Sequence, residues 1–247
     1  MSKRLGIDVG GSGIKGAIID DETGELLTER VRFTTPQPAT PSAMASTIAR
    51  IVDELDWKGK AFGCGFPAAI QHGVVRTAAN IDSKWIDVNG EELIGKKTGC
   101  KVKMLNDADA AGLAEMRWGA GKGVQGVVIV VTVGTGLGTA IFSDGQLLPN
   151  TELGHLPLRG YPAEKLAADS AKEQLGLSWK TWRGNFHEYL GLMEQFFWPD
   201  LFIIGGGISK KPSRFMKDWG GRAEMVPAQM KNEAGIAGAA MAIDPAA

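Results

Sequence analysis

Apolar residues recur along the chain in short, β-branched runs that end in glycine. The run at Leu5–Val9 stops at a glycine-rich turn, and a second apolar run over 15–20 follows at once. The run at Val127–Val133 stops and resumes in the same way. Because two apolar runs joined by a short glycine turn are typical of a β-hairpin, the pattern predicts two hairpins of one design.

The rest of the first half has a pattern that predicts strands alternating with helices. We expect a three-strand meander over 5–9, 15–20 and 26–33, a loop at Thr34–Pro41, and a helix from a Ser42 cap to about Leu55. Lys60–Ile70 predicts a buried strand that ends in a turn. Lys101–Leu105 predicts a strand that leads into a helix closed by Gly119.

The second half repeats the order of hairpin, helix and late strand. Leu201–Ser209 predicts that strand and its turn. Between them, Leu177–Trp198 carries bulky residues three or four apart, which predicts a helix with a core-facing stripe: Trp179, Trp182, Phe186, Tyr189 and Leu190. A stacking platform for a base or a sugar is the alternative for these aromatic side chains.

Two copies of a strand-rich α/β unit predict two lobes with a substrate cleft between them. We expect the boundary near Asn106, with one lobe over 1–105 and the other over 106–247. A single doubly wound sheet is the alternative, and it would leave the repeated hairpins unexplained.

Composition narrows the class of protein. The chain has 247 residues, 44% of them hydrophobic, and a formal net charge of −1, which argues against a nucleic-acid-binding surface. Cys64 and Cys100 have no metal-site spacing, and no apolar segment of signal-peptide length precedes the first strand. No apolar run approaches the ~20 residues needed to span a bilayer. We therefore expect a cytoplasmic protein with no membrane partner.

The glycine turns are candidate phosphate sites. Glycine leaves backbone N–H groups bare, Ser12 and Thr135 add hydroxyls, and Lys15 adds a positive charge close to the first turn. One such turn is weak support, because glycine turns also occur for structural reasons. Two turns, the first preceded by Asp8, make phosphate binding the better interpretation.

Asp107 is the candidate catalytic base. It follows a predicted strand and opens a predicted helix, where ligands of open α/β sheets usually bind. Phosphoryl transfer to a hydroxyl needs a carboxylate that orients the hydroxyl and accepts its proton. A helix N-cap is the alternative role for Asp107. Asp109 should point elsewhere on the helix and serve a structural role.

Five motifs occur in the order seen in the ROK family of sugar kinases, which the chain resembles over its length: DVGGSGIK at Asp8–Lys15, LNDADAAGLAE at Leu105–Glu115, VGTGLGTA at Val133–Ala140, ELGH at Glu152–His155 and IIGGGISK at Ile203–Lys210. The resemblance implies the actin-like ATPase (ribonuclease H-like) fold, with the final helix free to pack back on the first lobe. The segments GFPAAI, TAANIDSKWI, NTELGHLPL, LSWKTW and WPDLFIIGGGISKK are most similar to family members that use polyphosphate on glucose.

The resemblance also implies a set of site residues. Sugar contacts are expected from Asn80, Gly65 with Phe66, Asn106, Asp107, Glu152, His155 and Glu164. Donor contacts are expected from Asp8, Gly10, Gly11, Ser12, Gly13, Lys15, Gly134, Thr135, Gly136, Gly138 and the third turn, Gly205, Gly206 and Gly207 with Lys210. ATP-using relatives hold adenosine at that third turn.

Mg²⁺ is expected as cofactor, held mainly by donor phosphates and water, with Asp8 orienting it. No zinc is expected, because the chain lacks the cysteine-rich loop that many ROK members carry after ELGH. His155 falls in the motif where those members supply a ligand, and a lone histidine makes no zinc site.

The implied activity is transfer of a phosphoryl group from inorganic polyphosphate to the 6-hydroxyl of glucose, with ATP left open as a second donor and a homodimer expected. An ATP-dependent kinase for another hexose is one alternative. A non-enzymatic sugar sensor is another, although ROK repressors carry a helix-turn-helix domain ahead of the first glycine turn, and here only Met1–Arg4 precede the first predicted strand. Five basic residues after the third turn predict either an anion track or a solvated helix face: Lys210, Lys211, Arg214, Lys217 and Arg222.

Overall fold

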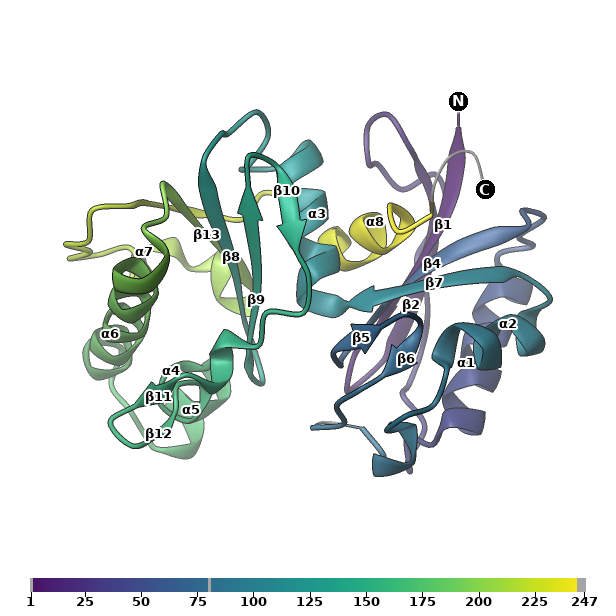
Figure 1. Cartoon of the computed structure of the whole chain (residues 1–247), viewed down its shortest axis with the longest axis horizontal. Coiled ribbons are helices and arrows are strands. Elements are labelled where there is room, and N and C mark those ends of the chain that lie inside the picture. Colours follow the sequence, from purple (N-terminus) through teal and green to yellow (C-terminus); the bar gives the residue numbers. More distant parts are fainter. Residues whose placement is uncertain (1, 80, 244–247) are drawn as a thin grey trace. The chain divides into compact units, whose positions relative to one another are not determined.

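The computed structural model describes residues 2–79 and 81–243, and the chain divides into two compact units. Unit 1 comprises Met1–Ala114 and Glu233–Ala247, and unit 2 comprises Glu115–Asn232. Each unit contains a five-stranded mixed sheet with helices packed against it (Figure 1). The division falls inside a helix, after Ala114, whereas the expected lobe boundary lies between residues 105 and 106.

The sheet of unit 1 has the strand order β3-β2-β1-β4-β7. Its strands are β1 (Lys3–Val9), β2 (Ile14–Asp20), β3 (Val31–Phe33), β4 (Ala61–Phe66) and β7 (Lys101–Asn106). The first three strands are antiparallel neighbours, while β4 is parallel to both β1 and β7. A small separate hairpin joins β5 (Ile70–Gln71) to β6 (Val74–Val75).

Two sequence expectations in unit 1 need correction. The third strand of the meander covers only Val31–Phe33. Before it, the pairing with β2 is reduced to an isolated bridge between Ile19 and Leu26, and the Thr28 hydroxyl accepts the Ile18 N–H at 3.1 Å. The first helix, α1 (Pro41–Glu54), is capped by Thr40, whose side chain accepts the Ala43 N–H. Pro41 favours this earlier start, because its fixed φ suits the first helical position and its missing N–H needs no partner.

The last helix, α8 (Ala234–Ala240), packs against β1 and β4 of unit 1 (yellow in Figure 1). A Cβ atom at Gly6 would lie 1.9 Å from the Ile236 carbonyl oxygen, and one at Gly63 would lie 1.7 Å from that of Ala239. Only glycine permits this backbone approach. Unit 1 also contains α2 (Gly90–Thr98) and the first part of α3 (Asp107–Trp118), the helix in which the division falls and which ends just before Gly119 as expected.

Unit 2 repeats the arrangement of hairpin and parallel strand. Its sheet has the order β10-β9-β8-β13-β14, formed by β8 (Val127–Val133), β9 (Leu137–Ser143), β10 (Gln146–Leu148), β13 (Leu201–Gly206) and β14 (Glu224–Pro227). β8 is antiparallel to β9 and parallel to β13, as β1 is to β2 and β4. A second hairpin joins β11 (Pro157–Leu158) to β12 (Tyr161–Pro162). The predicted repeat of the hairpin is confirmed.

The longest helix of unit 2, α6 (Trp179–Phe197), carries the predicted aromatic stripe. Trp182, Phe186 and Tyr189 are fully buried in the core of the unit, so their packing role is confirmed. Trp179 is only partly buried. The shorter helices are α4 (Glu164–Ala167), α5 (Asp169–Gln174) and α7 (Pro212–Phe215).

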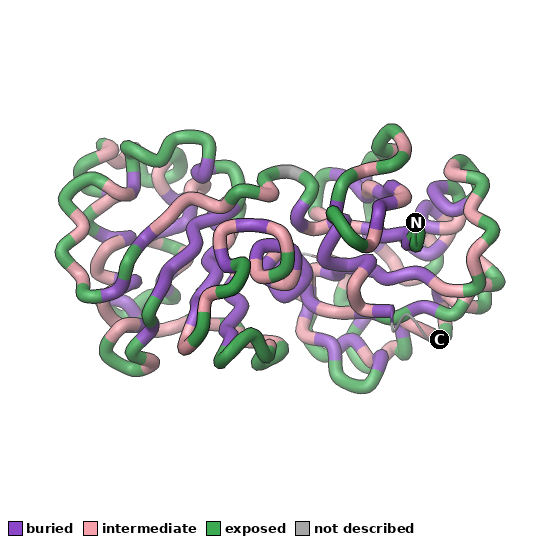
Figure 2. The backbone as a smooth tube through the Cα atoms, turned by 90° about the horizontal axis from the view of Figure 1, so that it is seen from above, coloured by how far each residue is buried: buried purple, intermediate pink, exposed green. Residues whose placement is uncertain are grey.

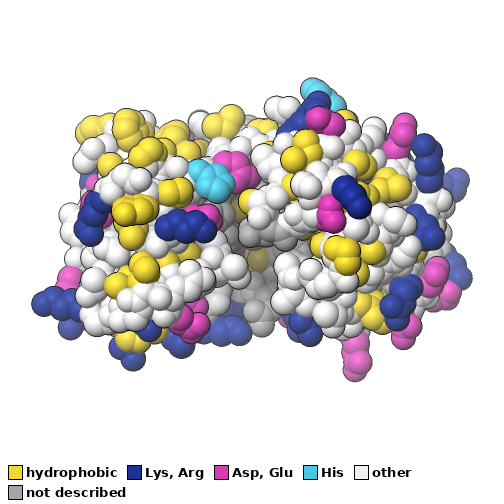
Figure 3. All heavy atoms as spheres, turned by 90° about the horizontal axis from the view of Figure 1, so that it is seen from below, with side chains coloured by type: hydrophobic (Ala, Val, Ile, Leu, Met, Phe, Trp, Pro, Cys, Tyr) yellow, Lys and Arg dark blue, Asp and Glu magenta, His cyan; other side chains and the backbone are white. Residues whose placement is uncertain are grey.

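In each unit the buried residues lie on the strands and on the inner faces of the helices, and many of the exposed residues lie in the connections (Figure 2). On the face that Figure 3 shows, Lys and Arg side chains are interspersed with Asp and Glu on both units, in line with the small net charge. Within the described ranges, no helix combines the length and the apolar character that crossing a bilayer requires.

Candidate functional site

The carboxyl ends of three parallel strands meet at one edge of the unit 1 sheet. Asp8 on β1 is paired with Gly65 on β4, and Phe66 at the end of β4 is paired with Asn106 at the end of β7. This register follows from the parallel pairing, which aligns strand ends. The predicted residues Asp8, Gly65, Asn106 and Asp107 therefore belong to one edge of one sheet.

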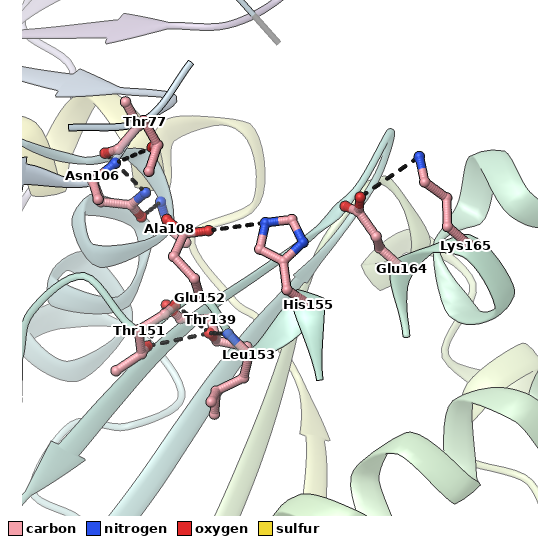
Figure 4. Close-up of polar contacts among 12 residues, drawn as sticks. Thr77, Asn106, Ala108, Thr139, Thr151, Glu152, Leu153, His155, Glu164 and Lys165 are labelled. Carbon is pink, nitrogen blue, oxygen red and sulfur yellow. Dashed lines mark hydrogen bonds and ion pairs between the residues drawn. The ribbon is translucent and has the colours of Figure 1, made fainter. Parts of the chain in front are cut away.

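Asn106 provides the N-cap of α3. Its buried side-chain oxygen accepts the N–H groups of Ala108 at 2.8 Å and Asp109 at 3.1 Å, and its amide nitrogen donates to the Ala68 carbonyl at 3.3 Å (Figure 4). Asp107 is the first residue of the helix and is half-buried, and its Oδ1 accepts the Ala108 N–H at 2.9 Å. The capping role therefore falls to Asn106. Asp109 is 1% exposed and lies in the interior.

The first glycine turn is closed by a Gly10 N–H to Gly13 carbonyl hydrogen bond of 3.0 Å. Lys15 lies opposite Asp8 in the hairpin, and its Nζ is 3.2 Å from Asp8 Oδ2. The same carboxylate faces the first turn of α8, since a Cβ atom at Gly235 would lie 2.8 Å from Asp8 Cγ. Gly11 and Ser12 at the tip are exposed to solvent.

Sequence reasoning missed Arg32 at this turn. Its guanidinium donates to the Ser12 carbonyl at 3.3 Å and lies 2.7 Å from the place that a Cβ of Gly13 would take. Arg32 is paired with Lys15 across β2 and β3. Because the three-strand meander was predicted, pairing its second and third strands in register would have placed a second cation beside the turn.

The second glycine turn is held by α5 and approached by Glu164. Ser170 on α5 donates its hydroxyl to the Thr135 carbonyl at 2.6 Å and its N–H to the Gly134 carbonyl at 3.2 Å. A Cβ atom at Gly136 would lie 2.7 Å from Glu164 Oε2. The turn therefore brings a predicted donor residue, Gly136, beside a predicted sugar residue, Glu164. Gly138 follows on β9.

Glu152 and His155 lie at the ends of a short turn that begins after β10. The buried Thr139 on β9 positions this turn, because its hydroxyl donates to the Thr151 carbonyl at 2.6 Å and accepts the Leu153 N–H at 3.2 Å. His155 Nε2 is 3.8 Å from Glu152 Oε2 (Figure 4). The structure thus brings the two ELGH side chains together.

Partial burial raises the pKa of Glu152 above its ordinary value, His155 opposes this effect, and the negative charge of Glu164 adds to it. The Glu152 side chain is 41% exposed, so solvent screens these charges. The neighbouring carboxylates and the imidazole together offer acceptors and a donor, as recognition of several sugar hydroxyls requires.

The third glycine turn lies beside the start of the second. Gly206 is paired with Val133 at the end of β8 and has a φ of 77°, and a Cβ there would lie 2.3 Å from the Val133 carbonyl oxygen. Ser209 donates its hydroxyl to the Gly206 carbonyl at 2.8 Å. Gly206, Gly207 and Lys210 are exposed, while Gly205 is buried.

The basic residues after this turn do not share one partner. Lys211 and Arg214 lie over the indole of Trp179, whereas Arg222 lies over Trp198 and donates to the Pro199 carbonyl at 2.6 Å. Asn80, which was predicted to contact the sugar, lies outside the described residues.

Across residues 2–79 and 81–243, no group of three or more His, Cys, Asp and Glu side chains is arranged to hold a metal ion. Mg²⁺ beside phosphates needs no such group, because it usually takes one or two carboxylates together with water and phosphate oxygens. Asp8, next to the first glycine turn, fits that requirement. Burial and the charge of Asp8 raise the pKa of the Cys64 thiol, which keeps it protonated and a poor ligand.

Comparison with known proteins finds relatives among the sugar kinases. The model of the ROK family matches residues 4–172. The chain is 50% identical to the polyphosphate glucokinase of Mycobacterium tuberculosis (strain H37Rv) over 96% of its own length and 90% of that protein. It is 48% identical to the polyphosphate glucokinase of Mycobacterium leprae over 96% of its own length and 74% of that protein.

Solved structures agree with these relatives. The inorganic polyphosphate/ATP-glucomannokinase from Arthrobacter sp. strain KM matches with a TM-score of 0.93 and 47% identity, covering 98% of both chains. The ROK family glucokinase from Streptomyces griseus, solved with glucose and AMPPNP, matches with a TM-score of 0.79 and 24% identity over 97% of this chain and 98% of that one. At 24% identity, the likeness to the Streptomyces griseus structure concerns the fold alone.

Proposed function

The chain belongs to the ROK family, and we propose that it transfers the terminal phosphoryl group of inorganic polyphosphate to the 6-hydroxyl of glucose. The observation that carries this proposal is the 50% identity, over 96% of the chain, to a polyphosphate glucokinase. The fold is the actin-like ATPase fold of ROK sugar kinases, as the sequence predicted.

Asp107 is the proposed catalytic base. Its carboxylate accepts the proton of the glucose 6-hydroxyl while that oxygen attacks the terminal phosphorus, and the shortened polyphosphate leaves. Two observations support this role. Asp107 follows the carboxyl end of β7 and is half-buried, and Asn106 accepts the N–H groups of both Ala108 and Asp109, so most of the capping of α3 falls to Asn106.

The glucose hydroxyls are bound, in this proposal, by Glu152, His155 and Glu164, with Asn106, the backbone at Gly65, and Asn80 completing the site. Glu152 lies within 3.8 Å of His155, and Glu164 influences the pKa of Glu152. Each buried polar group left unpaired by a wrong sugar costs about 1–3 kcal/mol, so such a set discriminates between isomers.

The three glycine turns, with Lys15 and Lys210, are the proposed donor-binding groups. Arg32 joins them, because its guanidinium lies over the first turn. When bound, Mg²⁺ neutralises phosphate charge, and Asp8 is the residue that would hold it through water. Lys15 keeps Asp8 fixed by their 3.2 Å ion pair.

ATP as a second donor and mannose as a second sugar belong to the same proposal. The specific observation in their favour is the 47% identity to a polyphosphate/ATP-glucomannokinase. We also propose a homodimer, on the resemblance to ROK kinases. A cytoplasmic location is supported by the free thiols of Cys64 and Cys100, which are typical of a reducing compartment.

Glucose 6-phosphate formation from purified polyphosphate, with nucleotide removed by prior treatment, tests the proposal. We expect turnover with polyphosphate and glucose, and its loss when either is left out. Parallel reactions with ATP and with mannose measure the second donor and sugar. Turnover with ATP and none with polyphosphate would reject the proposed donor and leave an ATP-dependent hexose kinase.

A further inference from the structure

Three cations of unit 2 converge on one half-buried indole. The distances to the centroid of the Trp179 ring are 4.6 Å from Lys172 Nζ, 5.6 Å from Lys211 Nζ and 5.1 Å from the guanidinium carbon of Arg214. We call Trp179, Lys172, Lys211 and Arg214 the Trp179 cluster. Its members come from three segments: α5, the start of α6, and the stretch around α7.

The indole is a fixed platform. Trp179 packs edge to face on the fully buried Trp182, with centroids 5.7 Å apart. Trp182 in turn donates its indole N–H to the Ala168 carbonyl at 2.9 Å and stacks on Phe186. Because these partners belong to the core, the cations gather over a surface that holds its position.

Within the described part of the chain, none of the three cations has a carboxylate within 4.0 Å. Because they surround one centroid, the distances between them are comparable with the Debye length, about 10 Å at 0.1 M salt, so they repel one another. A cation–π contact at an exposed site offsets only about 0.5–1 kcal/mol. The positive charge of the cluster is therefore not balanced by a neighbouring carboxylate in the described part of the chain.

The two segments that carry the cations of the Trp179 cluster each follow a glycine turn. Lys172 follows Ser170, which is hydrogen-bonded to the Gly134 and Thr135 carbonyls of the second turn. Lys211 follows the third turn, where Gly206 is paired with Val133. α7 lies beside α6, so Arg214 completes the group (Figure 1). An extended anion bound at these turns would meet the Trp179 cluster next.

We propose that the Trp179 cluster binds the internal phosphates of a long polyphosphate chain whose reacting end lies at the second and third glycine turns. The proposal rests on the proposed function for the direction of the chain. It divides the basic residues predicted from the sequence: Lys211 and Arg214 belong to the track with Lys172 and Trp179, whereas Arg222 lies over another ring.

The test compares two triple variants. The first combines Lys172→Gln, Lys211→Gln and Arg214→Gln. The second, its matched control, combines Lys97→Gln, Lys101→Gln and Lys122→Gln. The control removes the same charge from exposed positions outside the cluster. Direct binding of long-chain polyphosphate is measured by calorimetry without glucose, and KM is measured for long polyphosphate, tripolyphosphate and ATP.

We expect the triple variant to bind long polyphosphate at least tenfold more weakly than the control. The slope of log Kd against log salt should become shallower by about two, if each lost contact counts as in single-stranded nucleic acids. The KM values for tripolyphosphate and ATP should change much less. Trp179→Leu should weaken long-chain binding as well, because the cations lose their common platform.

Equal losses in the triple variant and the control, or equal losses for long and short donors, would overturn the proposal. So would unchanged binding of the long chain. If the wild type binds long polyphosphate through the cluster and yet transfers no phosphoryl group from it, the site stands and the proposed donor is wrong. Thermal unfolding of each variant shows whether a loss comes from the fold.

Discussion

At the scale of single residues, Asn106 and Asp107 have different roles: Asn106 supports the start of α3, and Asp107 is the proposed catalytic base. The Asn106 side chain accepts the first N–H groups of α3 and donates to the Ala68 carbonyl, and Asp107 shares only the Ala108 N–H with it. A base must keep its carboxylate available to the substrate hydroxyl. Adjacent residues thus provide the support and the proposed chemistry.

Asp107→Asn should retain the fold and most of the glucose affinity, while kcat falls by about 10²–10⁴-fold, the usual contribution of a general base. Glucose phosphorylation measured with polyphosphate at saturation checks this. Asp109→Asn is the control: its side chain is buried, so we expect a lower unfolding midpoint and a far smaller loss of kcat. Near-normal turnover in folded Asp107→Asn enzyme would remove Asp107 from the mechanism.

The pH dependence of glucose binding should reflect Glu152. Because its pKa is raised, Glu152 becomes protonated at a higher pH than an ordinary glutamate as the pH falls, and it then loses acceptor capacity for the proposed sugar hydroxyls. Glu164→Gln removes a like charge and should move the midpoint of this loss to lower pH. His155→Gln removes the opposing effect and should move it higher.

The measurement is the glucose Kd as a function of pH, taken for the wild type and both variants. Glu152→Gln is the reference, because it should flatten the dependence. An identical midpoint in all the other forms would show that a different group controls binding.

At the scale of elements, the second glycine turn connects the donor and sugar parts of unit 2. α5 fixes its carbonyls through Ser170, and α4 starts with Glu164, whose carboxylate lies against Gly136. A change in the turn should therefore be felt in the sugar site.

Gly136→Ala should raise the KM for glucose by about tenfold or more. The new methyl would lie 2.7 Å from Glu164 Oε2 and displace that carboxylate, and a hydrogen bond to a charged group contributes about 1.5–3 kcal/mol. Gly134→Ala is the matched control, because a Cβ there meets no atom within 4 Å. Equal increases in glucose KM for both variants would contradict the connection.

At the scale of the whole molecule, unit 1 is built from both ends of the chain. α8 returns to cover β1 and β4, and it buries Ile236, Ala237, Ala239 and Ala240. The backbone contacts at Gly6 and Gly63 show how closely it is seated. Unit 1 therefore cannot be complete until residues 234–243 have been made.

Deleting residues 234–247 should abolish cooperative thermal unfolding of unit 1. Ile236 alone contributes about 1.5–3 kcal/mol on burial, out of a total that is usually about 5–15 kcal/mol, and the uncovered strands would add to the loss. Circular dichroism on heating measures this. Deleting only residues 244–247 is the control, and a melting curve of the longer deletion that matches it would refute the prediction.

Local patterns in the sequence were enough for most elements. Both hairpins, the aromatic helix and the strand that leads into α3 follow from side-chain period and glycine conformation, which neighbours in the chain decide. Thr40 replaced Ser42 as a cap for an equally local reason, whereas the short β3 reflects a change in its pairing with β2 between Leu26 and Val31. The candidate residues Asn106 and Asp107 were recognisable because strand end and helix start are adjacent.

Only the tertiary structure brought distant residues together. Arg32 lies over the first turn because β3 pairs with β2, and Glu164 lies against Gly136 because α4 packs near the second turn. Lys172 and Arg214 share Trp179 although 42 positions separate them. Sequence by itself determined which segments form strands, helices and turns, since that depends on nearby residues. Which side chains meet depended on packing and strand register, and these arise only when the whole sheet and its helices are in place.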